Sequence, residues 1–311
     1  MRRSLLLILL TTLAAGCGTT GDTTPTPATP AARSSAPAPA PTLDNAGTGP
    51  GGANTAAVAA AVTAFLATLG VPQRATVVHD LQDEGRRVWS DHAADEVPRP
   101  GIAFTDLSGA QRASVMVVLS EALSDPGYAK VLTALNDASI AIYGTPTPRD
   151  PFVVQVGGAH LARNLTYHGD QVSMTPSLTG NDRGIATKAQ AVLAALSDQE
   201  KTAAQLATGV PDDLVMGPGQ DNTGYPQPEG LLVAELGDTA RNQVTALISS
   251  WTGDLDETAG RKLLAAYQAE YDRTRLCWID SYLRVDGPHV WIETLNDLTL
   301  FRDKTNDYGS S

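Results

Sequence analysis

The side chains with the clearest chemical potential lie near the end of the chain. In LTLFRDKTNDYG, residues 298–309, an apolar, strand-like run passes directly into Arg302, Asp303, Asn306, Asp307 and Tyr308. A guanidinium and a carboxylate form strong paired hydrogen bonds, and Asp and Asn side chains stabilise turns by bonding to the nearby backbone. This segment is therefore the strongest pointer to a site.

Two interpretations of the segment stay open. In the first, it binds a ligand through Arg302, Asn306, Asp307 and Tyr308. In the second, it is structural: Arg302 pairs with a carboxylate, Asp303 or Asn306 caps the turn, and Tyr308 packs.

No motif in the sequence names a reaction. There is no phosphate loop, no GxSxG, no HExxH, no cysteine spacing for a metal and no EF-hand loop, so the commonest enzyme classes lack direct support. The Gly-rich stretch MGPGQDNTGYPQPEG, residues 216–230, is predicted to be a surface loop. Cys277 lies in an apolar stretch and is interpreted as a small buried hydrophobe. Four histidines are isolated and are interpreted as surface or hydrogen-bonded residues: His79, His92, His168 and His289.

The N-terminus has the form of a secretory signal. Arg2 and Arg3 precede an apolar block, and LAAGC closes it at Cys17. The block is shorter than the approximately 20 residues that span a bilayer, and its end resembles the lipobox of bacterial lipoproteins. That resemblance implies a signal peptide over residues 1–16 and a lipid on the Cys17 thiol. We therefore expect the protein at the cell membrane, lipid-anchored on the extracytoplasmic face.

Residues 17–54 are rich in Pro, Thr and Ala and contain few large apolar side chains. Such a segment cannot bury enough surface to offset the entropy of ordering it, so it is predicted to be a tether. Residues 55–311 are long enough for a sizeable core, and they contain no second linker. We expect a single globular domain there.

The charge balance restricts the partners. The chain has 22 Lys and Arg against 34 Asp and Glu, a net charge of -12. This argues against nucleic-acid binding, which needs a basic face, and against attraction to anionic headgroups. The membrane partner is therefore expected to be reached through the lipid on Cys17 alone.

Hydrophobic periodicity predicts helices that alternate with strand groups. The predicted helices cover about 55–69, 108–124, 125–143, 184–206, 229–251 and 258–274. The strand groups cover about 151–177, with a turn at 168–170, and about 278–303, with a turn at 286–288. In the second group Leu283 and Val285 alternate with Tyr282 and Arg284, which favours one buried and one wet face. This order indicates an α+β fold with a mostly antiparallel sheet, and no convincing sequence repeat underlies it.

Five motifs, in order, resemble a bacterial family catalogued as domain of unknown function 3500. They are WSDHAADEVPRPGIAFTDLSGAQR, LSDPGYAKV, VGGAHLARNLTYHGDQVSMTPSLTG, GPHVWIETLND and FRDKTNDYG. The resemblance extends over about residues 60–309 and implies no known activity.

The family pattern is Gly-His-His-Leu on the middle strand, a Glu on a later strand, and His-x-His before the Arg-Asp ending. Imidazoles and a carboxylate gathered from several strands suit a first-row metal or acid–base chemistry. Here the first motif retains only His160, beside Ala159, and the His-x-His positions are Asn296 and Leu298. Three of the four imidazoles are missing, so we expect no bound metal and no cofactor.

Three functional hypotheses remain. The first is a lipid-anchored, extracytoplasmic binding or accessory domain with a degenerate metal-type site. The second is a hydrolase-like enzyme in which His160 activates water and Glu293 or Asp303 orients it. The third is a structural envelope protein. Both site hypotheses expect the two strand groups to share one sheet and to bring His160, Glu293 and Arg302 into one pocket.

Overall fold

The computed structural model describes residues 49–309. The predicted signal peptide, Cys17 and residues 18–48 of the predicted tether lie outside this range. Within it, no helix combines the length and apolarity needed to cross a membrane.

The described part of the chain forms eight α-helices and twelve strands. The helices are α1 (Thr55–Ala67), α2 (Val71–Val77), α3 (Gly109–Ala122), α4 (Asp125–Ala134), α5 (Arg183–Ala195), α6 (Asp198–Ala204), α7 (Asp238–Thr252) and α8 (Glu257–Gln268). The strands are β1 (Val78–His79), β2 (Ile102–Ala103), β3 (Ser139–Gly144), β4 (Phe152–Gly158), β5 (Leu161–His168), β6 (Gln171–Ser173), β7 (Ser177–Gly180), β8 (Leu231–Leu232), β9 (Arg275–Ile279), β10 (Tyr282–Asp286), β11 (Val290–Leu295) and β12 (Leu298–Asp303).

All twelve strands belong to one sheet, which confirms the predicted α+β class. Its order is β1-β3-β4-β5-β7-β12-β11-β10-β9-β8, with β2 added to β3 and β6 to β5. The strands pair antiparallel, apart from the parallel contact of β1 with β3. The two predicted strand groups meet where β7 runs antiparallel to β12, with Leu178 opposite Leu300.

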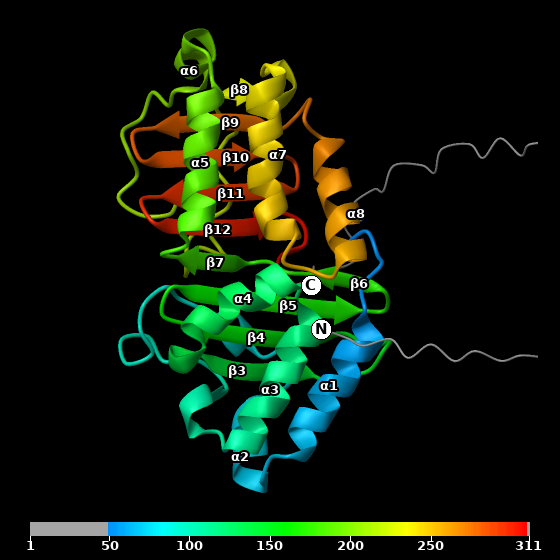
Figure 1. The fold of residues 1–311 in the computed structure, drawn as a ribbon. Helices are drawn as coiled ribbons and strands as arrows, with labels where there is room; N and C mark the ends of the chain where they lie inside the picture. Colours follow the sequence, from blue (N-terminus) through cyan, green and yellow to red (C-terminus); the bar gives the residue numbers. More distant parts are fainter. Residues whose placement is uncertain (1–48, 310–311) are drawn as a thin grey trace, which may run out of the picture. The chain divides into compact units, whose positions relative to one another are not determined.

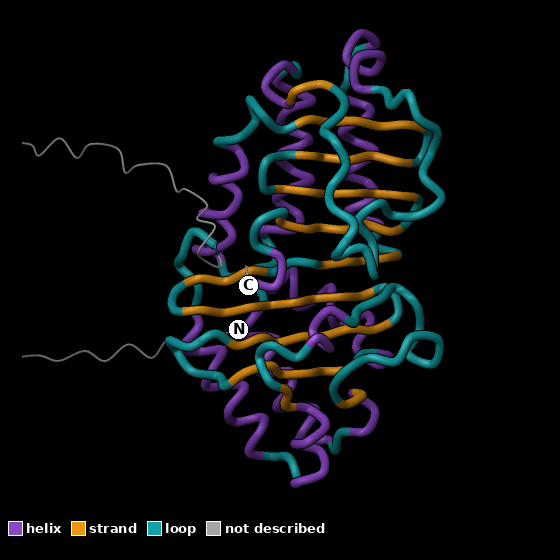
Figure 2. The backbone as a smooth tube through the Cα atoms, turned by 180° about the vertical axis from the view of Figure 1, so that it is seen from behind, coloured by secondary structure: helices purple, strands orange, loops and turns teal. Residues whose placement is uncertain are grey.

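The two faces of the sheet have different covers. Helices lie over one face, with α1, α3 and α4 on β3–β5 and α5, α7 and α8 on β9–β12 (Figure 1). Long loops cross the other face (Figure 2), and we call this the loop face. The prediction of a wet face beside Leu283 and Val285 is wrong: Tyr282 and Arg284 are buried on the loop face. The loop over residues 205–230 supplies this cover, and Met216 and Leu214 pack into the same apolar cluster as Tyr282.

A second correction concerns the segment after α4. The predicted helix over 125–143 ends at Ala134, and Ser139–Gly144 forms β3, with Ile140 opposite Val156. The spacing of apolar residues suited a helix, but the β-branched Ile140 and Ile142 also suit a strand, and pairing with β4 decides the outcome. The predicted helix over 184–206 is likewise divided, because Ser197 caps a new helix, α6.

The chain contains an internal repeat that the sequence comparison did not detect. In the first half, α1, α3 and α4 precede β3, β4, β5 and β7. In the second half, α5, α7 and α8 precede β9, β10, β11 and β12. The sheet order is symmetric about the β7–β12 contact, so an approximate twofold axis relates the halves.

Local contacts repeat as well. Gly101 and Gly230 both have positive φ (+89° and +94°), and a Cβ on them would lie 2.0 Å from Ile140 O and 2.1 Å from Leu276 O respectively. His160 O accepts a hydrogen bond from Gly180 N, and His289 O accepts one from Lys304 N, both at 2.8 Å. The spacing from Gly101 to His160 equals that from Gly230 to His289. Few identities accompany these matches, which explains why the repeat escaped detection.

Gly230→Ala tests the close approach of Gly230 to the Leu276 carbonyl. The added methyl meets the Leu276 carbonyl in a backbone conformation that L residues rarely adopt, so we expect a loss of about 2–4 kcal/mol in the free energy of unfolding. Chemical denaturation measures it. Gly209→Ala, where a Cβ would meet nothing within 4 Å, should change stability by less than about 0.5 kcal/mol. Equal effects of the two substitutions would contradict the proposed constraint.

Candidate functional site

A cavity of about 350 Å³ opens on the loop face, between the 205–230 loop and the end of the chain. We call it the C-terminal cleft. Its lining residues are Arg87, Met216, Asp221, Gly224, Tyr225, Arg302, Lys304, Thr305, Asp307 and Tyr308. Three of the four predicted binding residues, Arg302, Asp307 and Tyr308, therefore lie together here.

Arg302 is the central group of the C-terminal cleft, although only 3% of its side chain is exposed. Its Nε donates to Asp307 Oδ2 at 2.7 Å, one Nη to Met216 O at 3.0 Å and the other to Asp221 Oδ1 at 2.5 Å. Burial opposes the charge of Arg302, but Asp307 and Asp221 outweigh it, so the guanidinium pKa is raised. Arg302 thus pairs with carboxylates, as its structural interpretation predicted. The same hydrogen bonds fix the orientation of its guanidinium within the cleft.

Two tyrosines extend this network. Tyr308 accepts a hydrogen bond from Trp89 Nε1 at 2.7 Å and donates to Asp221 Oδ2 at 2.9 Å. Tyr225 donates to Asp307 Oδ2 at 3.2 Å. Burial raises the pKa of both hydroxyls, so they remain protonated and act as donors.

Cations lie over the aromatic rings of the C-terminal cleft. The Arg87 guanidinium is 5.5 Å from the centre of the Tyr308 ring. Lys304 Nζ is 5.1 Å from the Tyr225 ring and 5.1 Å from the Trp291 ring. These distances are in the range of cation–π attraction.

Glu293 does not line the C-terminal cleft but binds the loop that forms one of its walls. Its buried carboxylate accepts hydrogen bonds from Val215 N at 3.0 Å, Met216 N at 2.9 Å and Tyr282 Oη at 2.7 Å. Burial raises the pKa of Glu293, and the hydrogen bond from Tyr282 works in the opposite direction. Glu293 therefore fastens the 205–230 loop to the sheet, and it approaches Arg302 through their common partner Met216.

Asp303 and Asn306 do not line the cleft. Asp303 alternates with Arg302 and lies on the helix-covered face, where Tyr267 donates to its Oδ2 at 2.8 Å. Asn306 is buried, and its carbonyl accepts a hydrogen bond from Ser173 at 2.6 Å. The prediction that Asn306 belongs with the binding residues has no support from this geometry.

His160 lies apart from the other candidates. It occupies the β4–β5 turn with a left-handed backbone (φ +58°), and its side chain is exposed. A Cβ on Gly180 would lie 2.8 Å from His160 Cβ and 2.9 Å from Leu298 Cδ2, so these two side chains are neighbours. Arg302 is four residues further along β12 than Leu298, about 13 Å at 3.3 Å per residue.

The expectation that His160, Glu293 and Arg302 share one pocket is therefore wrong. Glu293 and Asp303 bind other groups, and neither orients His160. Two of the positions at which the family resemblance places imidazoles, 160 and 298, do lie together, but Leu298 cannot bind a metal. Among residues 49–309, no group of three or more His, Cys, Asp and Glu side chains is arranged to hold a metal ion.

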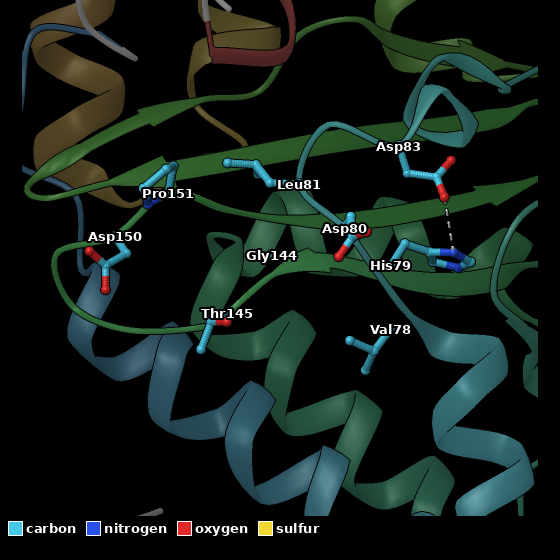
Figure 3. Close-up of a pocket in the computed structure, with 9 residues that line it drawn as sticks. All are labelled: Val78, His79, Asp80, Leu81, Asp83, Gly144, Thr145, Asp150 and Pro151. Atoms are coloured by element: carbon cyan, nitrogen blue, oxygen red, sulfur yellow. Dashed lines mark ion pairs between the residues drawn. The ribbon is translucent and has the colours of Figure 1, made fainter.

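A larger cavity, of about 710 Å³, lies at the β1 edge of the sheet (Figure 3). Figure 3 shows His79 and Asp83 pointing toward each other, with 3.9 Å between Nδ1 and Oδ2. The His79 ring stacks on Tyr143 at 5.0 Å, and Asp150 accepts a hydrogen bond from Thr147. These pairings join residues close together in the sequence, whereas the C-terminal cleft gathers buried charges from distant segments.

Sequence reasoning missed Asp221 and Tyr225, because it treated their loop as surface. An acidic and an aromatic residue within that Gly-rich stretch were the available signal. Cys277 is buried on the loop face, and burial raises the pKa of its thiol to about 12, which agrees with an unreactive residue.

Residues 51–310 match the family described as "Protein of unknown function (DUF3500)". Because the match covers most of the chain, the protein belongs to this family, as the sequence motifs indicated. The search of curated proteins and the search of solved structures both found no match.

Asp303→Asn tests the burial of this carboxylate. Burial raises the pKa of Asp303 to about 6 and outweighs the hydrogen bonds from Thr305 and Tyr267. The unfolded chain releases this proton near pH 4, so ionisation makes the folded state progressively less favourable as the pH rises from about 4 to about 6. Asp303→Asn lacks this pH-dependent loss of folding stability, which amounts to about 3 kcal/mol in the wild type.

The free energy of unfolding, measured by denaturation at pH 4, 5, 6 and 7, should therefore rise for Asp303→Asn relative to wild type across this window. Asp297→Asn, a substitution of the same type in the exposed β11–β12 turn, is the control. Parallel curves for wild type and Asp303→Asn would contradict the prediction.

Proposed function

We propose that this protein is a lipid-anchored, extracytoplasmic binding protein whose C-terminal cleft takes an uncharged, polyhydroxylated ligand, a saccharide. The observation that carries the proposal is the rigid Arg302 network, which converges on a cavity of about 350 Å³. Small-molecule sites typically measure about 300–1,000 Å³ and contain a few fixed polar groups.

The charges of the C-terminal cleft favour an uncharged ligand. Arg302 pairs with Asp221 and Asp307, and Lys304 pairs with Asp286 at 2.5 Å. With Arg87, which also lines the cleft, three cations face three carboxylates. Hydroxyl groups of a sugar can donate to carboxylates and accept from Arg87 and Lys304, and hydrogen bonds to ionised partners are the stronger kind. A strongly charged ligand would instead meet groups of both signs.

The predicted anchor agrees with this proposal. A flexible tether over residues 18–48 would have a root-mean-square reach of roughly 30 Å, and up to about 95 Å if extended. A cleft carried on such a tether could contact envelope glycans away from the lipid surface.

The proposal also holds that the metal-type site expected from the family resemblance is degenerate in this protein. Ala159 and Leu298 offer no ligand atoms, and His160 has no carboxylate to orient it among residues 49–309. The hydrolase-like alternative therefore has no specific observation in its favour.

Tryptophan fluorescence tests the saccharide proposal, because Trp89 contacts Tyr308 and Trp291 contacts Tyr225 at the cleft. Chitotriose and cellotriose are suitable probes, one N-acetylated and one not. Saturable quenching or enhancement is expected with at least one of them. Arg87→Gln removes a donor near the Tyr308 ring and should weaken binding about fivefold, which corresponds to about 1 kcal/mol.

Arg149→Gln, an exposed substitution of the same type in the β3–β4 loop, should bind as wild type does. A saturable signal that Arg87→Gln leaves unchanged would place the ligand elsewhere. No saturable signal up to about 10 mM of either probe would overturn the saccharide class.

Elemental mass spectrometry tests the degenerate metal-type site. The purified protein should hold no stoichiometric metal, and His160→Ala should give the same result. A stoichiometric metal in the wild type that is lost in His160→Ala would overturn this part of the proposal and favour the enzyme hypothesis.

A further inference from the structure

Two adjoining cavities lie on the helix-covered side, where the two repeats meet. Their volumes are about 260 and about 450 Å³, and they share Lys130, Asp182 and Gly184 as lining residues. We call them together the seam cleft. In Figure 1, α4 lies just below the lower ends of α5 and α7, and these three helices form its walls.

Three charged side chains at the seam cleft, two of them buried, comprise two cations and one carboxylate. Asp254 Oδ1 pairs with Lys130 Nζ at 2.6 Å, and Asp254 Oδ2 with Arg163 at 3.4 Å. The side chains of Asp254 and Arg163 are each 1% exposed. One carboxylate thus faces two cations, and burying an uncompensated charge is costly.

The rim of the seam cleft adds to this imbalance. Arg183 and Lys188, from the first turns of α5, line the two cavities. Asp182, the N-cap of α5, accepts from Gly184 N at 2.8 Å and Ile185 N at 3.2 Å. It keeps its negative charge, which also attracts Arg163. Four cations, Lys130, Arg163, Arg183 and Lys188, thus face two carboxylates, Asp182 and Asp254. The N-terminal end of this 13-residue helix also carries partial positive charge.

The lining also offers apolar surface. Pro126 and Ile185 border the smaller cavity, together with Lys130 and Lys188. An anionic group placed near Lys130 would leave room for an apolar portion against Pro126 and Ile185.

We propose that the seam cleft binds an organic anion, a carboxylate or phosphate attached to an apolar group, as a second site independent of the C-terminal cleft. The anion supplies counter-charge to the four cations, which Asp182 and Asp254 match only in part. Because α4 belongs to the first repeat and α5 and α7 to the second, such a ligand contacts both repeats.

Calorimetric titration of the purified full chain tests this site with benzoate, phenyl phosphate and inorganic phosphate at constant ionic strength. The organic probes should bind saturably. Tighter binding of phenyl phosphate than of inorganic phosphate would assign a role to the apolar lining, and equal binding would overturn that part. The double variant Arg183→Gln/Lys188→Gln should weaken binding at least about fivefold.

The control is Arg74→Gln/Arg149→Gln, which removes the same charge from exposed positions in the first repeat and should leave the affinity unchanged. Equal weakening in both double variants would mean general charge screening and would overturn the site, as would the absence of saturable binding in the wild type.

Lys130→Met provides a second readout. It leaves Arg163 and Asp254 as a balanced pair, so the variant should lose the calorimetric signal while its thermal midpoint stays near that of the wild type. Full retention of binding in a folded Lys130→Met variant would contradict the proposed role of Lys130.

Discussion

The antiparallel pairing of β7 with β12 is the contact on which the rest of the structure depends. It places Ser177 opposite Phe301 and Leu178 opposite Leu300, and it turns two smaller sheets into one continuous sheet. Each repeat buries its helices against its own strands, so this pairing sets the relation between the repeats. The seam cleft and the C-terminal segment are both positioned by it, because β7 leads into α5 and β12 leads into residues 304–309.

Both faces of this sheet are buried, and within residues 49–309 α-helices cover only one of them. The loop face is therefore sealed by long connections, which bring polar backbone groups over buried strands. Such groups must find partners. Glu293 and Arg302 supply them: the carboxylate accepts from two backbone amides of the 205–230 loop, and the guanidinium donates to the Met216 carbonyl. The C-terminal cleft lies where this cover ends.

The sequence was sufficient for the class of fold, because turn residues such as Gly169 and Gly287 and the strand patterns between them are local signals. It was insufficient for β3, because Ile140 and Ile142 fit the spacing of a helix as well as that of a strand. Only pairing with β4 determines that this segment is a strand. The repeat was hidden because its matching positions are backbone requirements, such as the close approach at Gly101 and Gly230, more than shared side chains. Arg302, Asp307 and Tyr308 form one local segment, and the sequence grouped them correctly. Asp221 and Tyr225 join them only through a loop whose path no local pattern determines.

The repeats also supply an internal comparison for the buried charges. On the loop face of the first repeat, Gln155 pairs with Asn164 across β4 and β5 and donates to the Arg86 carbonyl of the covering loop. The corresponding positions on β10 and β11 are Arg284 and Glu293. Arg284 pairs with Asp286 at 3.5 Å, whereas Glu293 binds the 205–230 loop. A neutral amide pair is thus able to hold a covering loop, and it avoids the cost of burying charge. In the second repeat these positions therefore hold ionisable residues that bond to different partners. Glu293 accepts from two backbone amides of its covering loop, whereas Gln155 donates to one carbonyl of its own, so the two loops are anchored by different chemistry.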